Sequence, residues 1–231
     1  MQKNLKNIFI NLQNRFGNLK WWPVDKNYHE KNKSDYRFEI IVGAILTQNT
    51  AWSNVEKALI NIKSKNMLDI KNISKLEIKE LRKLIKPSGF FNQKAKRLKE
   101  ITKHIEKKYN GNLDNFFNRK IKDLRNELLM LNGIGPETAD SIILYAGNKP
   151  IFVVDAYTKR ICERIPINTK ISYEDIQNFF QKELSKLYKK DQLTKIYNEF
   201  HAQIVNLAKD YCRKKPLCKD CPINKICMYK K

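Results

Sequence analysis

The chain has 231 residues, of which 42% are hydrophobic and 30% charged, so it can bury a sizeable core and is not a disordered polymer. Lys and Arg number 46 against 24 Asp and Glu, a formal net charge of +22. Such a surface repels itself unless it works on a polyanion, which favours nucleic acid over an anionic membrane. No run approaches the roughly 18 apolar residues of a membrane span, and the first residues lack the apolar core of a signal peptide. We therefore expect that the protein does not bind a membrane and that it is cytoplasmic, associated with the nucleoid if the source is prokaryotic.

Apolar residues recur with the 3.6-residue period of amphipathic helices over most of the chain. Val55, Leu59 and Ile62, for example, share one face of the segment 54–63. The only β-branched run, 151–154, is short, so the sequence predicts an all-α fold. Helices are predicted at about 3–16, 37–47, 54–63, 75–85, 93–108, 121–131, 137–147, 155–164, 173–187 and 191–210.

The segment Gly133-Ile134-Gly135 stands directly before Pro136, a residue suited to the first position of a helix. The glycines allow a tight turn with positive φ and leave backbone N–H groups uncovered. These groups, with the positive dipole end of the next helix, can face a phosphate, while Ile134 fills the space between the two helices. An ordinary helix connection with a glycine cap explains the segment about equally well.

Asp155 follows four apolar residues and precedes a helical pattern, so it is predicted to cap that helix. The same placement leaves a carboxylate that can stabilise an oxocarbenium-like sugar cation or orient a water, as cleavage of a glycosidic bond requires. Capping alone also explains this residue. His29, His104 and His201 lie on unrelated segments without ligand-spaced partners and are interpreted as surface or core.

The hairpin, with Val154-Asp155 about twenty residues later, resembles the helix–hairpin–helix Gly/Pro-Asp superfamily of DNA glycosylases. The segments 38–50 and 86–95 look like that family's early helix with its Gln-bearing loop and its second DNA-facing turn. The resemblance implies a base-excision enzyme with Asp155 as the catalytic carboxylate. It also implies that one side chain, Gln48, wedges into the space left by an extruded nucleotide. The DNA-binding residues implied in this way are Gln48, Gly89, Lys94, Gly133, Ile134 and Gly135.

Four cysteines near the end of the chain are spaced C-x5-C-x2-C-x5-C. In a reducing compartment this pattern predicts a metal site, either zinc or a 4Fe–4S cluster, and not disulfides. It resembles the iron–sulfur loop of the endonuclease III branch, although the first gap is one residue shorter than the six usual there. The resemblance implies a 4Fe–4S cluster that folds a Lys-rich loop against DNA. Its ligands would be Cys212, Cys218, Cys221 and Cys227, whereas Cys162 is predicted to lie in the core.

In bifunctional members of the family, a lysine two positions after the second hairpin glycine forms a Schiff base with the sugar. This chain has Glu137 at that position, and a carboxylate cannot form an imine. We therefore predict a monofunctional glycosylase in which Asp155 directs water at the anomeric carbon. Lys94, Lys159 or another lysine that approaches from a different direction could restore lyase activity.

Two adjacent tryptophans precede Pro23 after the first predicted helix. They can staple that helix to the body of the protein, or an indole can stack on a flipped base. A cationic N-alkylated purine would be favoured there by cation–π attraction. Together with 43–52 and 135–140, the segment resembles the 3-methyladenine glycosylase subgroup, which implies an alkylated purine as substrate. The residues expected to form the base pocket are Trp21, Trp22, Pro23 and Trp52, the last with core packing as its alternative role.

We expect two helical lobes with a cleft for DNA and the lesion between them. The central lobe, 24–147, would carry the helix–hairpin–helix motif at 124–147. Residues 1–23 and 148–231 would form the second lobe, with the iron–sulfur loop at 212–227. The predicted monomer flips a damaged base from double-stranded DNA and hydrolyses its N-glycosidic bond. Two alternatives remain open: a bifunctional endonuclease III-type glycosylase and AP lyase acting on oxidised pyrimidines, and a non-catalytic DNA-binding or redox-sensing iron–sulfur protein.

Overall fold

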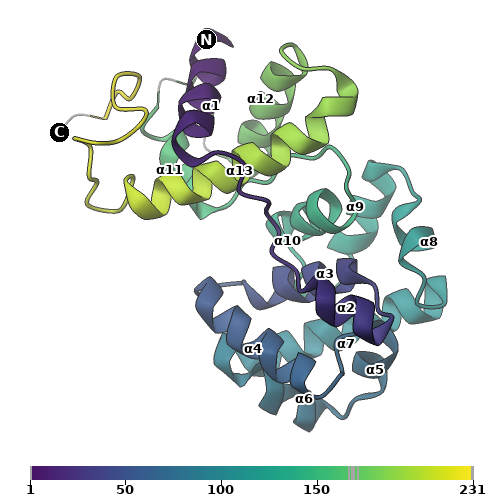
Figure 1. Ribbon diagram of the computed structural model, residues 1–231. Helices are drawn as coiled ribbons and strands as arrows, with labels where there is room; N and C mark the ends of the chain where they lie inside the picture. The colour runs from purple at the N-terminus through teal and green to yellow at the C-terminus, as the bar shows by residue number, and fades with distance from the viewer. Residues whose placement is uncertain (1, 166, 168–169, 171, 230–231) are drawn as a thin grey trace. The chain divides into compact units, whose positions relative to one another are not determined.

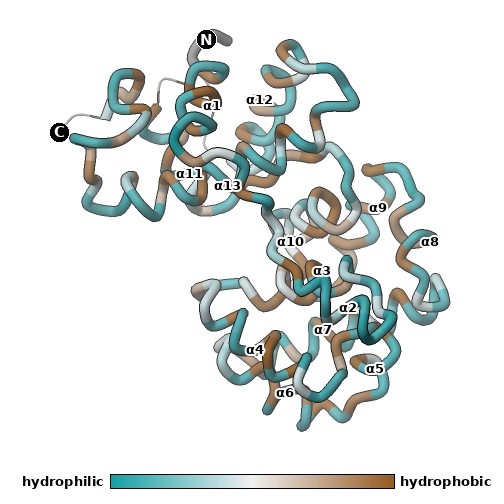
Figure 2. The backbone as a smooth tube through the Cα atoms, viewed as in Figure 1, coloured by the Kyte–Doolittle hydropathy of each residue, from teal (hydrophilic) through white to brown (hydrophobic). Residues whose placement is uncertain are grey.

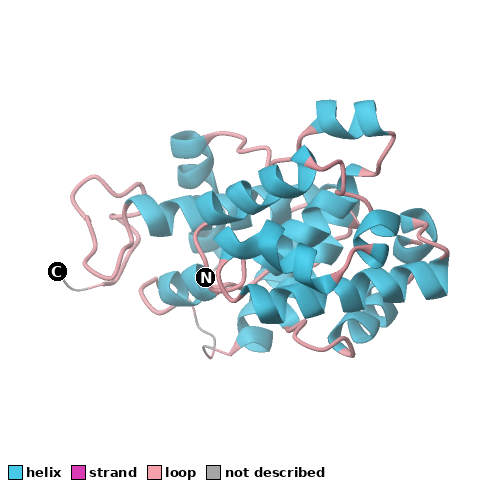
Figure 3. Ribbon diagram, turned by 90° about the horizontal axis from the view of Figure 1, so that it is seen from below, coloured by secondary structure: helices cyan, strands magenta, loops and turns pink. Residues whose placement is uncertain are grey.

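The computed structural model describes residues 2–165, 167, 170 and 172–229, which form helices joined by loops (Figures 1 and 3). This part of the chain contains no β-strand, so the predicted all-α class is confirmed. None of its helices is long and apolar enough to cross a membrane. The chain divides into two compact units. We call Trp22–Asn148 the hairpin unit, and Met1–Trp21 together with Lys149–Lys231 the cysteine unit.

The hairpin unit contains most of the helices of the chain. Three short ones (α2, α5 and α8) were not predicted from periodicity; each begins after an Asp or Asn whose side chain accepts a hydrogen bond from the helix backbone. The elements of this unit are α2 (Lys26–Asn32), α3 (Tyr36–Leu46), α4 (Trp52–Ser64), α5 (Ile70–Lys75), α6 (Ile78–Ile85), the 3-10 turn η1 (Lys86–Ser88), α7 (Phe91–Tyr109), α8 (Leu113–Phe117), α9 (Ile121–Leu129), α10 (Pro136–Ser141) and the π-helical turn η2 (Ile142–Ala146).

Helix α3 is the centre of the hairpin unit. All its residues from Phe38 to Leu46 are buried, because α4, α7, α10 and η2 pack around it. A helix that is apolar on every side needs such a cover. Helices α4 and α7 are amphipathic instead, and along them hydrophilic and hydrophobic colours alternate in Figure 2. In α4, the predicted apolar face with Val55, Leu59 and Ile62 is buried.

The cysteine unit is built from segments at both ends of the chain. Helix α13 contacts α1 and α11, and α12 contacts α1 and α11 as well. An aromatic cluster fills this core: the Phe152 ring stacks on Phe180 with centroids 4.4 Å apart, and Phe9 lies 4.9 Å from Phe200. After α13 the chain continues as loop (Figure 3). The elements of this unit are α1 (Gln2–Phe16), α11 (Ala156–Cys162), α12 (Tyr173–Ser185), the 3-10 turn η3 (Lys190–Gln192) and α13 (Leu193–Asp210).

Candidate active site and nucleic-acid interface

The turn between α9 and α10 is a tight hairpin with one buried plug. Gly133 has a φ of +78°, which L side chains rarely adopt. The next residue, Ile134, is 4% exposed and packs into the core between the helices. Gly135 stands at the N-cap of α10 without a side-chain cap, and α10 begins at Pro136 as predicted. Its first backbone N–H groups therefore lack a capping side chain, the arrangement that suits a phosphate.

The side chain of Gln48 is bound to this hairpin. Its Nε2 donates to the carbonyl oxygen of Gly133 at 3.0 Å and to Oγ1 of Thr138 at 2.9 Å. The guanidinium of Arg97 donates to Gln48 Oε1. The sequence assigned Gln48 to DNA but gave no signal for Arg97, which lies in the middle of a Lys-rich helix. The loop after α3 and the hairpin are thus one hydrogen-bonded assembly within the hairpin unit.

Lys94 differs from the prediction. It was expected to contact DNA, but its side chain is 1% exposed, and its Nζ donates to Leu46 O at 2.8 Å and Ser88 O at 2.7 Å. Burial, helped by the charge of Arg97, lowers the pKa of Lys94 to about 8. An ammonium enclosed in this way cannot reach a phosphate. Its role in the structure is to join the end of α3 to the turn before α7.

The turn before α7 exposes an aromatic ring. Gly89 has a φ of +66° and Phe90 a φ of +44°, so two successive residues lie in the left-handed region. The Phe90 side chain is 62% exposed. A large apolar side chain held in a costly conformation at the surface points to a functional use. The sequence marked the glycine of this turn but not the phenylalanine beside it.

Three of the four residues predicted to form the base pocket, Trp22, Pro23 and Trp52, lie near one another in the hairpin unit. Trp22 lies edge-on against Trp52, with ring centroids 5.4 Å apart, and against Tyr145 at 5.3 Å. Its indole also covers Gly43, where an added Cβ would come within 2.9 Å of Trp22 Nε1. Pro23 and Trp52 line a common cavity. Trp21 belongs to the cysteine unit and Trp22 to the hairpin unit, so the adjacent pair is divided between units.

Asp155 caps α11 as predicted. Its Oδ1 accepts hydrogen bonds from Thr158 N at 2.7 Å and from Thr158 Oγ1 at 2.8 Å. Its Oδ2 lies 3.8 Å from Nε2 of His201, which α13 supplies. The sequence missed this neighbour, because 46 residues separate the two in the chain and no motif connects them. A carboxylate with one oxygen fixed by the helix can present the other to a reacting sugar.

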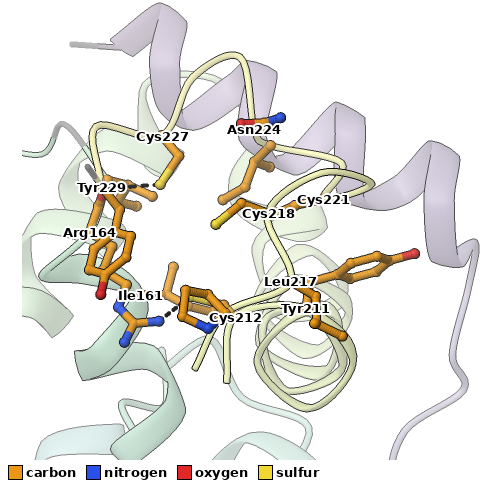
Figure 4. Close-up of a pocket in the computed structure, with 13 residues that line it drawn as sticks. Ile161, Arg164, Tyr211, Cys212, Leu217, Cys218, Cys221, Asn224, Cys227 and Tyr229 are labelled. Carbon is orange, nitrogen blue, oxygen red and sulfur yellow. Dashed lines mark hydrogen bonds between the residues drawn. The ribbon is translucent and has the colours of Figure 1, made fainter. Parts of the chain in front are cut away.

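The four cysteines line one cavity of the cysteine unit (Figure 4). Cys212 Sγ accepts a hydrogen bond from Arg164 Nη1 at 3.2 Å, and Cys227 Sγ donates to Arg164 O at 3.2 Å. Burial raises the pKa of Cys221, and the other three thiols contribute in the same direction. In the described chain, however, no three Cys, His, Asp or Glu side chains are grouped tightly enough to bind one metal ion. The ligand set therefore stays a prediction. Cys162 is buried, as predicted, and burial raises its pKa to about 12.

The fold and the hairpin define a helix–hairpin–helix protein, and a comparison with protein families gives the same class. A family model described as "HhH-GPD superfamily base excision DNA repair protein" matches residues 42–186. This chain belongs to that superfamily.

Its relatives make the identification more specific. A putative DNA repair glycosylase of Methanocaldococcus jannaschii is 45% identical over 96% of this chain and 95% of its own length. A crystal structure of the H. pylori 3-methyladenine DNA glycosylase bound to 1,N6-ethenoadenine is similar with a TM-score of 0.72 and 30% identity, over 90% of this chain and 95% of that one. An endonuclease III trapped on DNA reaches a TM-score of 0.75 over 98% and 95% of the two chains; at 19% identity it shows the common fold alone. The chain is a DNA repair glycosylase of the endonuclease III-like kind.

Proposed function

We propose that this protein is a monofunctional glycosylase that removes an alkylated purine from double-stranded DNA. The observation that carries the proposal is the state of Asp155, a helix cap whose Oδ1 takes both hydrogen bonds from Thr158. Its Oδ2 can therefore face the sugar. As the base leaves with the electron pair of the glycosidic bond, positive charge develops on the sugar, and a carboxylate stabilises it. Water then adds to the anomeric carbon and loses a proton, which leaves an abasic site.

The absence of lyase chemistry is supported by Glu137. It is exposed on the first turn of α10, at the position where bifunctional relatives were expected to have lysine. A carboxylate cannot supply the amine of a Schiff base. Lys94, which could have replaced it, uses its ammonium to bridge two backbone carbonyls.

The alkylated purine is supported by the aromatic group around Trp22. A ring that packs on Trp52 and Tyr145 is held in a fixed orientation, which suits stacking on a flat base. Electron-rich rings also attract a base that alkylation has made cationic. Such a base is a good leaving group, so the site needs little acid assistance. The H. pylori glycosylase named above was crystallised with a modified adenine, and it is 30% identical to this chain.

We further propose that Cys212, Cys218, Cys221 and Cys227 hold a 4Fe–4S cluster. The described lining of their cavity contains four thiols and no carboxylate, and the guanidinium of Arg164 donates to one of the sulfurs. Thiolates with few competing oxygen ligands suit iron–sulfur clusters and zinc, and a nearby cation offsets their charge. When bound, the cluster would cross-link the segment 212–227. The residues of the chain alone perform the glycosidic chemistry.

The test incubates the purified protein with duplexes that each carry one lesion: an alkylated purine, an oxidised pyrimidine, 8-oxoguanine, uracil or a thymine–guanine mismatch. Each reaction is divided and analysed with and without hot alkali. Breaks in the alkylated duplex only after alkali are the expected result. Breaks without alkali, or a borohydride-trapped adduct in good yield, would restore the lyase alternative. No break in any duplex would leave a DNA-binding protein.

The Asp155→Asn variant tests the assigned carboxylate. Asn caps helices about as well as Asp, so the fold should be kept. We expect excision to slow by roughly a hundredfold or more, while binding to lesion DNA is retained. A variant as fast as the wild type would refute the mechanism.

A further inference from the structure

The two oxygens of the Asp155 carboxylate have different surroundings. Oδ1 is fixed by the backbone and hydroxyl of Thr158, which belong to the same turn. Oδ2 faces Nε2 of His201 at 3.8 Å, and the Asp155 side chain is 13% exposed. This distance is too long for a hydrogen bond, and an approach of less than about 1 Å would bring it into range. Catalytic hydrogen bonds are often long in a free enzyme and tighten with substrate.

His201 is held in a fixed place by the core. Its side chain is 8% exposed, and the ring packs edge-on against Phe152 with centroids 6.5 Å apart. Burial lowers the pKa of His201, and the charge of Asp155 opposes that effect. Burial also raises the pKa of Cys162 and of Tyr197 to about 12 each, so both groups are neutral at pH 7. Asp155 is a neighbouring charge that acts on the pKa of His201.

We propose that His201 is a positioning residue, which donates Nε2–H to Asp155 Oδ2 and aims this oxygen at the sugar. The inference rests on the proposed function, because it is defined by the role of Asp155. A neutral imidazole is the suitable donor for this task. It orients the carboxylate and keeps it ionised, yet leaves its negative charge uncompensated for the developing sugar cation. A charged lysine or arginine at the same place would weaken that charge.

The competing interpretation is a core histidine that only fills space beside Phe152. Three substitutions separate the two. His201→Phe keeps the ring but removes the donor, His201→Asn keeps a donor that is too short to reach Oδ2, and His201→Gln places an amide N–H where Nε2 stood. The control is His104→Gln in the hairpin unit, where the native histidine bonds Glu127 at 2.6 Å and has no part in the proposed chemistry.

Single-turnover excision and lesion-DNA binding are measured for each variant against pH. We expect the Phe and Asn variants to lose roughly 10- to 100-fold in the excision rate, as for other residues that orient an active group, with unchanged DNA affinity. The Gln variant should stay near the wild type. Without the donor, protonation of Asp155 becomes easier, so the acid limb of the rate profile should move to higher pH in the Phe variant. The control should change neither rate nor profile.

Wild-type rates and profiles in both the Phe and Asn variants would overturn the proposal. Equal losses of excision rate in all three variants would also overturn it, because the N–H donor kept in the Gln variant would then give no advantage. If the His201→Phe variant does not fold, the excision rates of His201→Asn and His201→Gln still test the proposal. The Asp155→Asn variant distinguishes failure of the proposed function from failure of the inference about His201. If that variant is fast, the proposed mechanism itself is wrong; if it is slow while His201→Asn is fast, only the inference about His201 fails.

Discussion

Both units hold irregular backbone in place with cationic side chains that donate to carbonyl oxygens, but the surroundings of these cations differ. In the hairpin unit, Lys94 joins Leu46 O and Ser88 O from a fully enclosed position with 1% exposure. In the cysteine unit, Arg160 donates to Cys212 O at 2.8 Å and Arg164 to Arg213 O at 2.8 Å. Both arginines are partly exposed.

The segments that these cations hold differ in the same way. The loops around Lys94 lie between helices whose apolar faces are buried, and they take their stability from that core. In the described segment 211–229, only Cys212 and Ile223 are buried. A segment that removes so little apolar surface from water cannot order itself by packing. The comparison teaches that the loops of the hairpin unit are covered by helices of the chain itself, whereas the segment 211–229 lacks such a cover, which the proposed cluster would supply.

The largest effect is expected from Cys221→Ser. A structural metal site of four thiolates contributes roughly 10 kcal/mol to the order of its segment, so loss of one ligand should release most of it. We expect the variant to lose its iron and its broad visible absorbance. Trypsin should then cleave rapidly after the lysines between 213 and 226, while the hairpin unit stays resistant.

The matched control for this prediction is Cys162→Ala, because Cys162 is buried in α11 and outside the cavity. It should keep the iron and the absorbance. If the wild-type protein is colourless and contains zinc, the four cysteines form a zinc site and not an iron–sulfur cluster. A wild-type protein without metal, and with an equally resistant segment, would contradict the comparison.

The next largest effect concerns Lys94→Met. The thioether fills similar space but leaves the carbonyls of Leu46 and Ser88 buried without their donor. Each unsatisfied group costs roughly 1–3 kcal/mol, so the free energy of unfolding in urea should fall by about 2–4 kcal/mol. Lys96→Met is the control, since Lys96 is exposed on the same helix. Equal stability of the two variants would show that the buried ammonium is not an anchor.

The sequence predicted most of the fold because its helices are long and their apolar periods are regular. It missed α2, α5 and α8, which are five to seven residues long. Their order comes from an Asp or Asn cap and from packing in the hairpin unit, which a periodicity argument over short windows does not detect.

For the candidate site, the sequence predicted the features that depend on neighbouring residues. It did not predict contacts between residues far apart in the chain. The cap at Asp155, the turn at Gly133 and the helix start at Pro136 depend on neighbouring residues, and all three are found. The pairing of Asp155 with His201 depends on tertiary structure. Lys94 was assigned to DNA because the segment 86–95 resembles a DNA-facing turn of the family, and only the tertiary structure shows its ammonium buried on two carbonyl oxygens.

A smaller effect is expected from Gly133→Ala, which tests the hairpin. A φ of +78° costs an alanine about 1–2 kcal/mol, and the new Cβ would collide with the Arg97 side chain that holds Gln48. We expect unfolding free energy to fall by about 2 kcal/mol, with weaker binding to undamaged duplex. Gly135→Ala is the control, because its φ of −89° is ordinary and its surroundings are open. Equal effects of the two substitutions would mean that the Gly133 turn is not strained.

The smallest effect, taken per pH unit, is the pH dependence of stability that Lys94 confers. Its pKa is about 8 in the folded protein and near 10.5 when unfolded. Between these values the unfolded chain binds a proton that the folded chain does not, so raising the pH favours the folded state. The stability of the wild type relative to Lys94→Met should therefore rise from pH 8 to pH 10.5, by at most about 1.4 kcal/mol per pH unit. Because the variant retains every other titrating group, the difference between their urea midpoints isolates this lysine. A difference that stays flat or falls over that window would mean that burial does not penalise the Lys94 ammonium. The contrast with the partly exposed arginines of the cysteine unit would then lose its physical basis.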